Sequence, residues 1–192
     1  MESATRRILD AAARQIASGG AAALSMSDIA HEASVSKALI HYHFEDKETL
    51  LSRLIEQLAH DLVAREREAL ASYEGSHNPL AVDALWQWLD GELERGDIRV
   101  LLELDSCRGA RVQLAAREAA ELRRATAKQT VEHLFTILEL RLRIEPALVA
   151  NVFVAFVDGL ALNVGVAVRE EVAPTARVAF DVFWLAMLSL AE

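Results

Sequence analysis

Residues 25–47 read SMSDIAHEASVSKALIHYHFEDK and decide how the rest of the chain is organised. Ser25 stands three residues before Asp28, which is the spacing of a capping box, so we expect a helix to begin there. A turn follows at residues 34–35, and Ser36 is placed to cap a second short helix. The stretch therefore predicts two short helices joined by a tight turn, a helix-turn-helix.

The second helix of this motif has one face for packing and one for solvent. Leu39, Ile40, His43 and Phe44 lie towards the packing side, with His43 expected to pack beside Phe44, whereas Lys37 and Tyr42 point outward. An outward face of Lys, small residues, imidazole and phenol suits the major groove of DNA, which admits a helix and offers hydrogen-bond acceptors and methyl groups.

Residues 5–58 resemble the amino-terminal region of the tetracycline-repressor (TetR) family of bacterial transcription regulators. The resemblance rests on a combination of short matches, each weak alone: Arg7-Ile8-Leu9-Asp10-Ala11-Ala12, Gly20, Ile29-Ala30, Val35-Ser36-Lys37, His43-Phe44 and Lys47-Glu48-Thr49-Leu50. Ser34 and Ala38 depart from the family pattern, because Gly is common at both positions. Ser34 must either avoid a positive φ or adopt one at a cost of about 1 kcal/mol. His41 replaces a usual Tyr, whereas Tyr42 keeps the second phenol that is expected to contact phosphate.

The resemblance implies an all-α fold of about nine helices in two domains. A helix-turn-helix DNA-binding domain would span residues 2–47, with the motif itself at 25–44, and a ligand-binding and dimerisation domain would span residues 48–192. A long helix at about 46–73 would link them, although it could equally be a simple packing helix. By resemblance, a small apolar or amphipathic effector would displace this helix and release a repressor from its operator.

The expected DNA contacts come from the motif and from the residue that opens the next helix. Lys37 should reach a base edge or a phosphate, and Tyr42 a phosphate. Lys47 and the neighbouring backbone N–H groups would hold another phosphate. The candidate DNA-binding residues are Ser27, Ser36, Lys37, Ala38, Leu39, His41, Tyr42 and Lys47, of which the two serines act first as caps.

The histidines of the motif do not predict a metal site. His41 and His43 point about 200° apart on a helix, so they cannot chelate one ion. We expect no metal and no cofactor. Protonation of His41 would instead strengthen DNA binding as the pH falls.

Composition and charge constrain the rest of the chain, which has 192 residues and is 53% apolar. The net charge is −9, which argues against general affinity for nucleic acid. Residues 1–47 carry five Lys or Arg and six Asp or Glu, a net charge of −1, so the remainder carries −8. Cys107 is the one cysteine, which excludes a disulfide within the chain. The amino terminus has no apolar signal core, and we expect a cytoplasmic protein.

The remaining helices are predicted from apolar spacing and from Gly and Pro breaks. The expected ranges are 5–18 for the first helix, then 46–73, from Pro79 to Arg95, 97–107, 112–143, 147–168 and 177–190, with a connector at 170–174.

Residues 147–168 are apolar enough to raise the alternative of a membrane span. A central Asp costs about 2.5 to 3.5 kcal/mol on insertion scales, and no basic flank anchors the segment, so we expect no membrane. Two consecutive helices this apolar predict a homodimer in which they pair with their symmetry mates as a four-helix bundle. Such a dimer would read a palindromic double-stranded DNA operator. The candidate interface residues are Phe153, Asp158, Leu162, Phe180, Phe183, Trp184 and Met187.

Aromatic and aliphatic side chains of the second domain could line an effector pocket with a few polar groups. The candidates are Trp86, Leu89, Leu104, Asp105, Phe135, Asn151 and Phe156. Most apolar residues here must form the core, and Asn151 and Asp158, seven apart on one face, could instead pair across the dimer interface.

Two other classes of function remain as alternatives. The sequence contains no Gly-rich phosphate loop, Gly-x-Ser-x-Gly elbow or His-Glu-x-x-His pair, so we do not expect an enzyme. A helical, dimeric small-molecule-binding or protein-interaction module without DNA binding would explain the apolar tail, but it would leave residues 35–47 as coincidence.

Overall fold

The computed structural model describes residues 3–73, 78, 80–166 and 169–192, with no side chains described for residues 164–174. In these ranges the chain is all-α, as predicted, and its one β-bridge joins Leu142 to Ala191. The described helices are α1 (Ala4–Gly19), α2 (Met26–Glu32), α3 (Lys37–His43), α4 (Lys47–Ala71), α5 (Leu80–Arg95), α6 (Asp97–Asp105), α7 (Ala110–Ile137), α8 (Pro146–Val166) and α9 (Arg169–Leu188).

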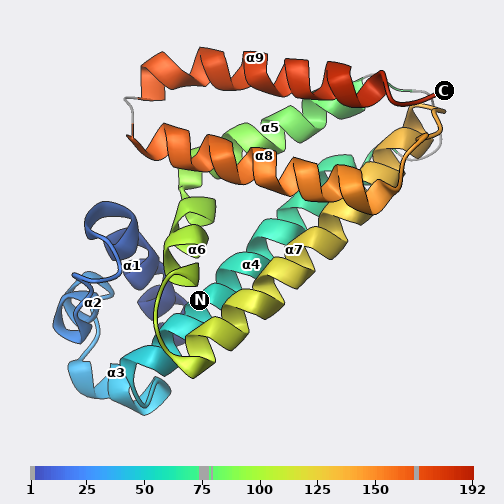
Figure 1. Ribbon diagram of the computed structural model, residues 1–192. Coiled ribbons are helices and arrows are strands. Elements are labelled where there is room, and N and C mark those ends of the chain that lie inside the picture. Colours follow the sequence, from blue (N-terminus) through green and yellow to red (C-terminus); the bar gives the residue numbers. More distant parts are fainter. Residues whose placement is uncertain (1–2, 74–77, 79, 167–168) are drawn as a thin grey trace. The chain divides into compact units, whose positions relative to one another are not determined.

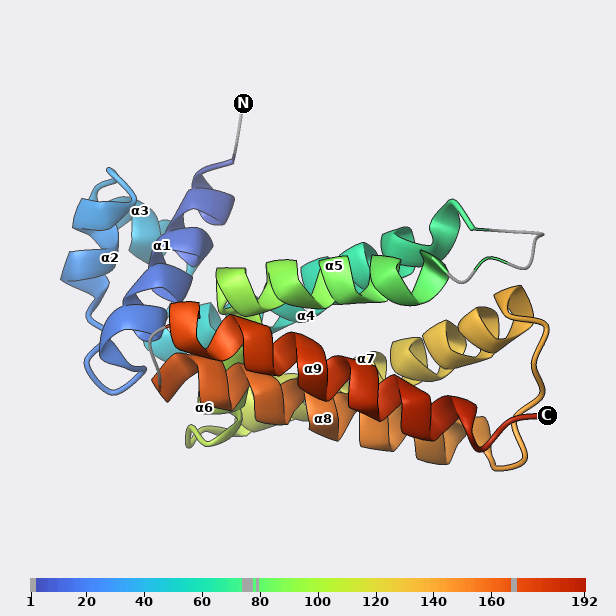
Figure 2. The same ribbon diagram turned by 90° about the horizontal axis from the view of Figure 1, so that it is seen from above.

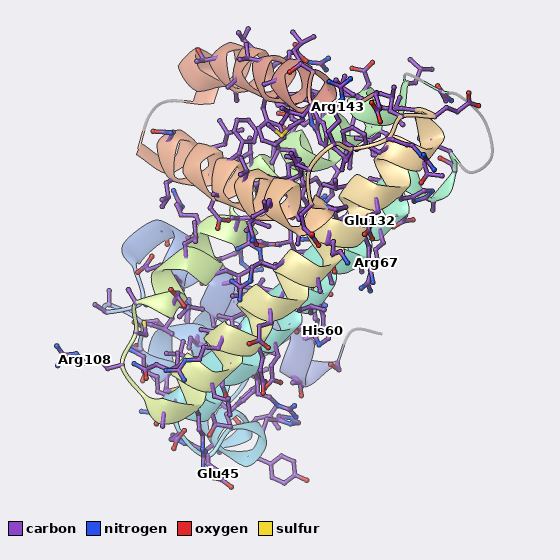
Figure 3. The ribbon with its side chains drawn as sticks, turned by 45° about the vertical axis from the view of Figure 1, so that its right-hand side comes forward. Glu45, His60, Arg67, Arg108, Glu132 and Arg143 are labelled. Atoms are coloured by element: carbon purple, nitrogen blue, oxygen red, sulfur yellow. The ribbon has the colours of Figure 1, made fainter. Side chains whose placement is uncertain are left out.

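The chain divides into two compact units. The N-terminal unit comprises Met1–His60 and Asp97–Ala120, and the C-terminal unit comprises Asp61–Gly96 and Glu121–Glu192. This division differs from a boundary at residue 47, because α6 packs against α1 and therefore belongs with the helix-turn-helix. Figure 3 labels His60, the last residue of α4 that belongs to the N-terminal unit.

The N-terminal unit is built around the apolar face of α1. Ile8, Leu9, Ala12 and Ile16 recur at helical spacing and are all buried, as predicted. They share the core with one large side chain from each short helix, Ile29 of α2 and Ile40 of α3, both fully buried. Since helices of seven residues are not stable alone, these buried side chains hold the motif in place.

Caps set the beginnings of the short helices where the sequence predicts them. The side chain of Ser25 accepts a hydrogen bond from the backbone N–H of Asp28 at 3.1 Å. Ser36 accepts one from the N–H of Leu39, also at 3.1 Å. Asp46 caps α4 through the N–H of Thr49 at 2.7 Å, and that hydrogen bond lowers the pKa of the Asp46 carboxyl.

The C-terminal unit is organised by α5, α8 and α9. Figures 1 and 2 show α8 and α9 side by side, with α5 packed against both. Aromatic rings fill the space between them: Phe153 of α8 lies within 6.2 Å of the ring centroids of Trp88, Phe183 and Trp184. Buried aromatic rings remove large apolar areas from water, so this cluster stabilises the unit.

Two predicted helix boundaries are wrong. The helix expected to run to residue 143 ends at Ile137, because Glu139 adopts φ 56° and the N–H of Leu140 turns back to the carbonyl of Phe135. Beyond it, Arg141 exchanges two backbone hydrogen bonds with Glu192. The expected connector at 170–174 belongs to α9, since a proline removes one helical hydrogen bond without excluding helix on both sides of it.

One buried carboxyl in the C-terminal unit lacks full compensation. Glu66 of α4 is 4% exposed, and its Oε1 atom has no hydrogen-bond partner among the described residues. Burial raises the pKa of Glu66 to about 7, although a hydrogen bond with Thr130 and the charges of Arg123 and Arg67 oppose the rise. The nearby Glu92, by contrast, is bound by Arg65 through two hydrogen bonds of 2.6 and 2.7 Å.

We expect Glu66 to make stability depend on pH. Because its folded-state pKa lies above the ordinary value of 4.5, the folded protein holds the proton more tightly than the unfolded chain does. The stabilisation of the folded state by this tighter proton binding is complete below about pH 4.5 and is lost as the pH rises to about 7. Glu66→Gln, which stays neutral, should therefore raise the free energy of unfolding at about pH 8 by roughly 1–3 kcal/mol relative to wild type.

Chemical denaturation of wild type and variant at several pH values measures this difference. Glu68→Gln provides the control, because Glu68 lies on the same helix but is exposed. A Glu66→Gln curve that runs parallel to wild type over the whole pH range would contradict the assignment.

Candidate nucleic-acid interface

The turn between α2 and α3 adopts the strained option that the sequence left open. Ser34 has φ 55°, so it tolerates the left-handed conformation that favours glycine. The N–H of Val35 closes the turn by donating to the carbonyl of Ala30 at 3.0 Å. With Ala33 buried just before the turn, the angle between the two helices is held by backbone contacts as well as by the core.

The outward face of α3 is as exposed as the spacing predicts. Lys37, Ala38 and His41 are exposed, Leu39 is half-buried, and Tyr42 is 82% exposed. A phenol left this far in solvent contributes little to the protein core and is accessible to another molecule.

Two smaller predictions about this motif are wrong. His43 is exposed rather than packed, and its ring lies edge-on to that of Tyr42 with centroids 5.3 Å apart. Ser27 is exposed and does not cap α2, because Ser25 occupies that position. Ser27 therefore has a free hydroxyl at the start of α2, where the helix dipole favours an anion.

Lys47 has a structural use that the sequence does not reveal. Its Nζ donates to the carbonyl of Leu24 at 2.9 Å and to that of Ala21 at 3.2 Å. These contacts tie the start of α4 to the loop that follows α1. They occupy two of the three donors of the ammonium group and leave one for another partner. The contact of Lys47 with DNA remains a prediction.

Few cations of the motif and of α1 are free to meet phosphates. Arg14 is paired with Glu32 at 2.6 Å, and Arg6 with Asp10 at 3.2 Å. Among the described residues up to Lys47, Arg7 and Lys37 are the exposed cations with no ion-pair partner. The electrostatic part of any DNA affinity must therefore be small for one copy of the chain.

The predicted effector residues do not gather in one place. Leu104 and Asp105 lie on α6 in the N-terminal unit, the first fully buried and the second exposed. Asn151 is exposed on α8. The remaining four, Trp86, Leu89, Phe135 and Phe156, belong to the C-terminal unit.

Hollows are described in both units. Phe135 and Glu132 line one of about 470 Å³ in the C-terminal unit, and Figure 3 labels Glu132 on α7. A second, of about 450 Å³, lies in the N-terminal unit beside Lys47, Glu103 and Arg108. In Figure 3 Arg108 extends away from the ribbon.

The predicted dimer residues are mostly core residues of their own chain. Phe153, Phe180 and Trp184 are at most 1% exposed and Phe183 is also buried, because these rings pack against one another and against α5. Asp158 pairs with Arg123 of α7. Leu162 is exposed, and Met187 is half-buried.

A different set of apolar side chains is exposed on α8 and α9. Leu148, Val152 and Leu162 of α8 are at least half exposed, as are Val178, Val182 and Leu185 of α9. The spacing of 148 and 152, and of 178, 182 and 185, is typical of one face of a helix. Within the described residues, Pro146–Asn163 is also the one stretch long and apolar enough to cross a membrane, with 28% of it buried.

The comparisons with known proteins agree with this arrangement. Residues 8–54 match the family described as bacterial regulatory proteins of the tetR family. The HTH-type transcriptional regulator BetI of Agrobacterium fabrum is 42% identical over 74 residues, which are 38% of this chain and 34% of that protein. BetI of Brucella suis biovar 1 is 39% identical over 73 residues. The chain thus matches about a third of the length of these relatives.

Solved structures match the whole fold at low identity. A transcriptional regulator from Rhodococcus sp. Rha1 is 19% identical with a TM-score of 0.77, and 98% of each chain is covered. A TetR transcription regulator from Haloarcula marismortui is 20% identical with a TM-score of 0.75, again over 98% of each chain. The SmeT–triclosan complex is 17% identical with a TM-score of 0.70, covering 96% of this chain and 91% of that one.

Proposed function

The chain belongs to the TetR family of bacterial regulatory proteins, and from this premise we propose that it is a cytoplasmic, DNA-binding transcription regulator. More narrowly, it is a repressor that a small apolar or amphipathic effector releases from its operator. The observation that carries the proposal is the exposed face of α3, which presents Lys37 and Tyr42 on a helix anchored from behind by Ile40. Membership of a family of regulators also supports the expectation that the chain is not an enzyme.

The contacts proposed for this face differ in kind. Lys37 and the half-buried Leu39 lie in the first turn of α3, where they can meet base edges, whereas Tyr42 is placed to donate its hydroxyl to a phosphate. The hydroxyls of Ser27 and Ser36 and the imidazole of His41 are further phosphate contacts. Ala38 adds a methyl group small enough for close approach of the helix to the groove.

A symmetric dimer would double this small set of contacts. We propose that α8 and α9 pair with the same helices of a second copy through the faces that carry Val152, Val182 and Leu185, which are 50%, 60% and 68% exposed. Covering these side chains stabilises association by about 25 cal/mol for each Å² of apolar surface removed from water. Two reading helices related by a two-fold axis would then meet half-sites about 34–36 Å apart on a palindromic operator.

Unpaired polar atoms support an effector site in the C-terminal unit. The indole N–H groups of Trp88 and Trp184 are buried and lack an acceptor among the described residues, as Oε1 of Glu66 lacks a donor. Each such group costs about 1–3 kcal/mol when it is left unpaired, which an effector with polar groups would recover. Trp86, Leu89, Phe135 and Phe156 remain our candidates for its apolar walls, whereas Asp105 and Asn151, being exposed, are weaker candidates.

Binding to DNA fragments from upstream regions of the protein's own genome tests the DNA-binding proposal. We expect specific binding at low ionic strength, and Lys37→Ala should raise the Kd by roughly 5- to 100-fold. Lys128→Ala is the matched control, because it removes the same charge from the C-terminal unit. Tyr42→Phe is likewise compared with Tyr73→Phe.

The salt dependence separates the two roles proposed for Lys37. A loss of slope of about 0.9 in Lys37→Ala indicates a phosphate contact, whereas an unchanged slope with altered sequence preference indicates a base contact. If no genomic fragment binds, the alternative of a dimeric helical module without DNA binding replaces this proposal.

Sedimentation of the purified protein tests the dimer. Wild type should sediment at twice the chain mass of 21.1 kDa, and Leu185→Glu together with Val182→Glu should sediment at the chain mass. Burying a carboxylate in an apolar interface costs several kcal/mol, whereas these exposed positions accept it in the monomer. Leu114→Glu on α7, 57% exposed, should leave the dimer intact. A monomeric wild type would refute the interface.

A further inference from the structure

Glu66 of α4 is buried with one of its side-chain oxygens unpaired. The residue is 4% exposed in the C-terminal unit, and Thr130 of α7 forms a side-chain hydrogen bond with it. Its Oε1 atom has no hydrogen-bond partner among the described residues. A buried acceptor without a donor destabilises the folded protein, and it does so more strongly when the acceptor is charged. Such an atom in a native protein needs an explanation, and a bound ligand is one.

Two other acids of the same unit each have an arginine partner. Arg65 of α4 donates to both carboxylate oxygens of Glu92 on α5, at 2.6 and 2.7 Å. Arg123 of α7 is paired with Asp158 of α8. The charge of Arg123 also lowers the pKa of Glu66, whereas the charge of Glu92 raises it, because two carboxylates repel each other. Both arginines are therefore engaged by acids other than Glu66.

A third arginine, Arg67, is also directed at other oxygens. Figure 3 labels it beside α7, where its guanidinium donates to the hydroxyl of Thr126 at 3.2 Å and to the side-chain oxygen of Gln129 at 3.4 Å. Arg67 is exposed, so water weakens the effect of its charge on Glu66. Among the described residues, Glu66 is thus a buried carboxyl that forms no ion pair.

The chemistry of the missing partner follows from these surroundings. Oε1 of Glu66 needs a hydrogen-bond donor, and an ammonium group both donates to a carboxylate and neutralises it, whereas a hydroxyl group only donates. Aromatic rings are close to the acids: Trp88 lies one turn before Glu92 on α5, and its ring centroid is 6.2 Å from that of Phe153. Such rings attract cations and pack against apolar groups. A ligand with an ammonium head and an apolar body fits both features.

We propose that the effector of the C-terminal unit is a cationic amphiphile, an amine whose ammonium group pairs with the buried carboxylate of Glu66. This inference rests on the proposed effector-responsive function and names the chemical class of the effector. A bound ammonium favours the ionised carboxylate and so lowers the pKa of Glu66, which is about 7 without it. The amine should therefore bind more tightly as the pH rises through about 7, and its binding at that pH should release a proton.

Octylammonium and 1-octanol are matched probes, because they share the apolar chain and differ in the charge of the head group. Calorimetric titration of the full-length protein gives the Kd of each probe at about pH 5.5 and about pH 8, a range over which an alkylammonium stays charged as a Lys side chain does. From the lower to the higher pH, the Kd of octylammonium should fall roughly 10- to 30-fold, because Glu66 becomes ionised. The Kd of 1-octanol should change by less than about 2-fold, since a hydroxyl group carries no charge.

Two variants separate pairing with Glu66 from a general change of the protein. Glu66→Gln removes the charge and keeps the shape of the side chain, so at about pH 8 octylammonium should bind at least about 10-fold more weakly than to wild type, and its Kd should no longer depend on pH. Binding of 1-octanol should be unchanged in this variant, which shows that the apolar part of the site is intact. Glu68→Gln is the matched control, because Glu68 is exposed on the same helix, and it should behave like wild type.

Three results would overturn the assignment of a cationic effector. They are no binding of octylammonium to wild type, binding no tighter than that of 1-octanol at about pH 8, and equal pH dependence in wild type and Glu66→Gln. The titrations contain no DNA, so failure of wild type to bind any DNA refutes the proposed function separately. An octylammonium complex with unchanged DNA affinity would refute the proposed release by an effector.

Discussion

Two helices of seven residues each cannot persist in water on their own, and the presentation of α3 depends on removing that instability. Burial of Ile29, Ile40 and Phe44 in the core of the N-terminal unit supplies the stabilisation. Local hydrogen bonds then decide where each helix begins, and the positive φ of Ser34 sets the bend between them. The outer face of α3 can stay exposed because the inner face packs against the core.

How well the structure could be predicted from the sequence depends on the range of the interaction concerned. The caps at Ser25, Ser36 and Asp46 involve neighbours three residues away, and all three were predictable. Lys47 was expected at a phosphate, but it binds carbonyls more than twenty residues earlier in the chain. The spacing of apolar and polar residues in the sequence does not predict such a long-range contact. The burial of Glu66 was equally unpredictable, since a carboxylate in a charged helical stretch gives no sign that its own position faces inward.

The apolar helices α8 and α9 illustrate a different limit. A helix that is apolar on nearly every side shows no preferred face, so spacing cannot say which residues meet their own chain. The aromatic residues proved to be inside, because large rings fill the space between α5, α8 and α9, while smaller Val and Leu side chains were left in solvent. The apolar composition of α8 and α9 therefore predicts pairing, but it does not identify the residues at the interface.

Pairing of two copies through the exposed aliphatic faces of α8 and α9 would make DNA binding depend on the concentration of the protein in the cell. In the proposed dimer, a lone copy would offer DNA only half of an already sparse set of cations. While monomers predominate, the population of the DNA-competent pair grows with the square of the protomer concentration. A modest change in synthesis or degradation would then alter promoter occupancy more than proportionally, giving the gene it controls a sharper threshold than a monomeric reader could provide.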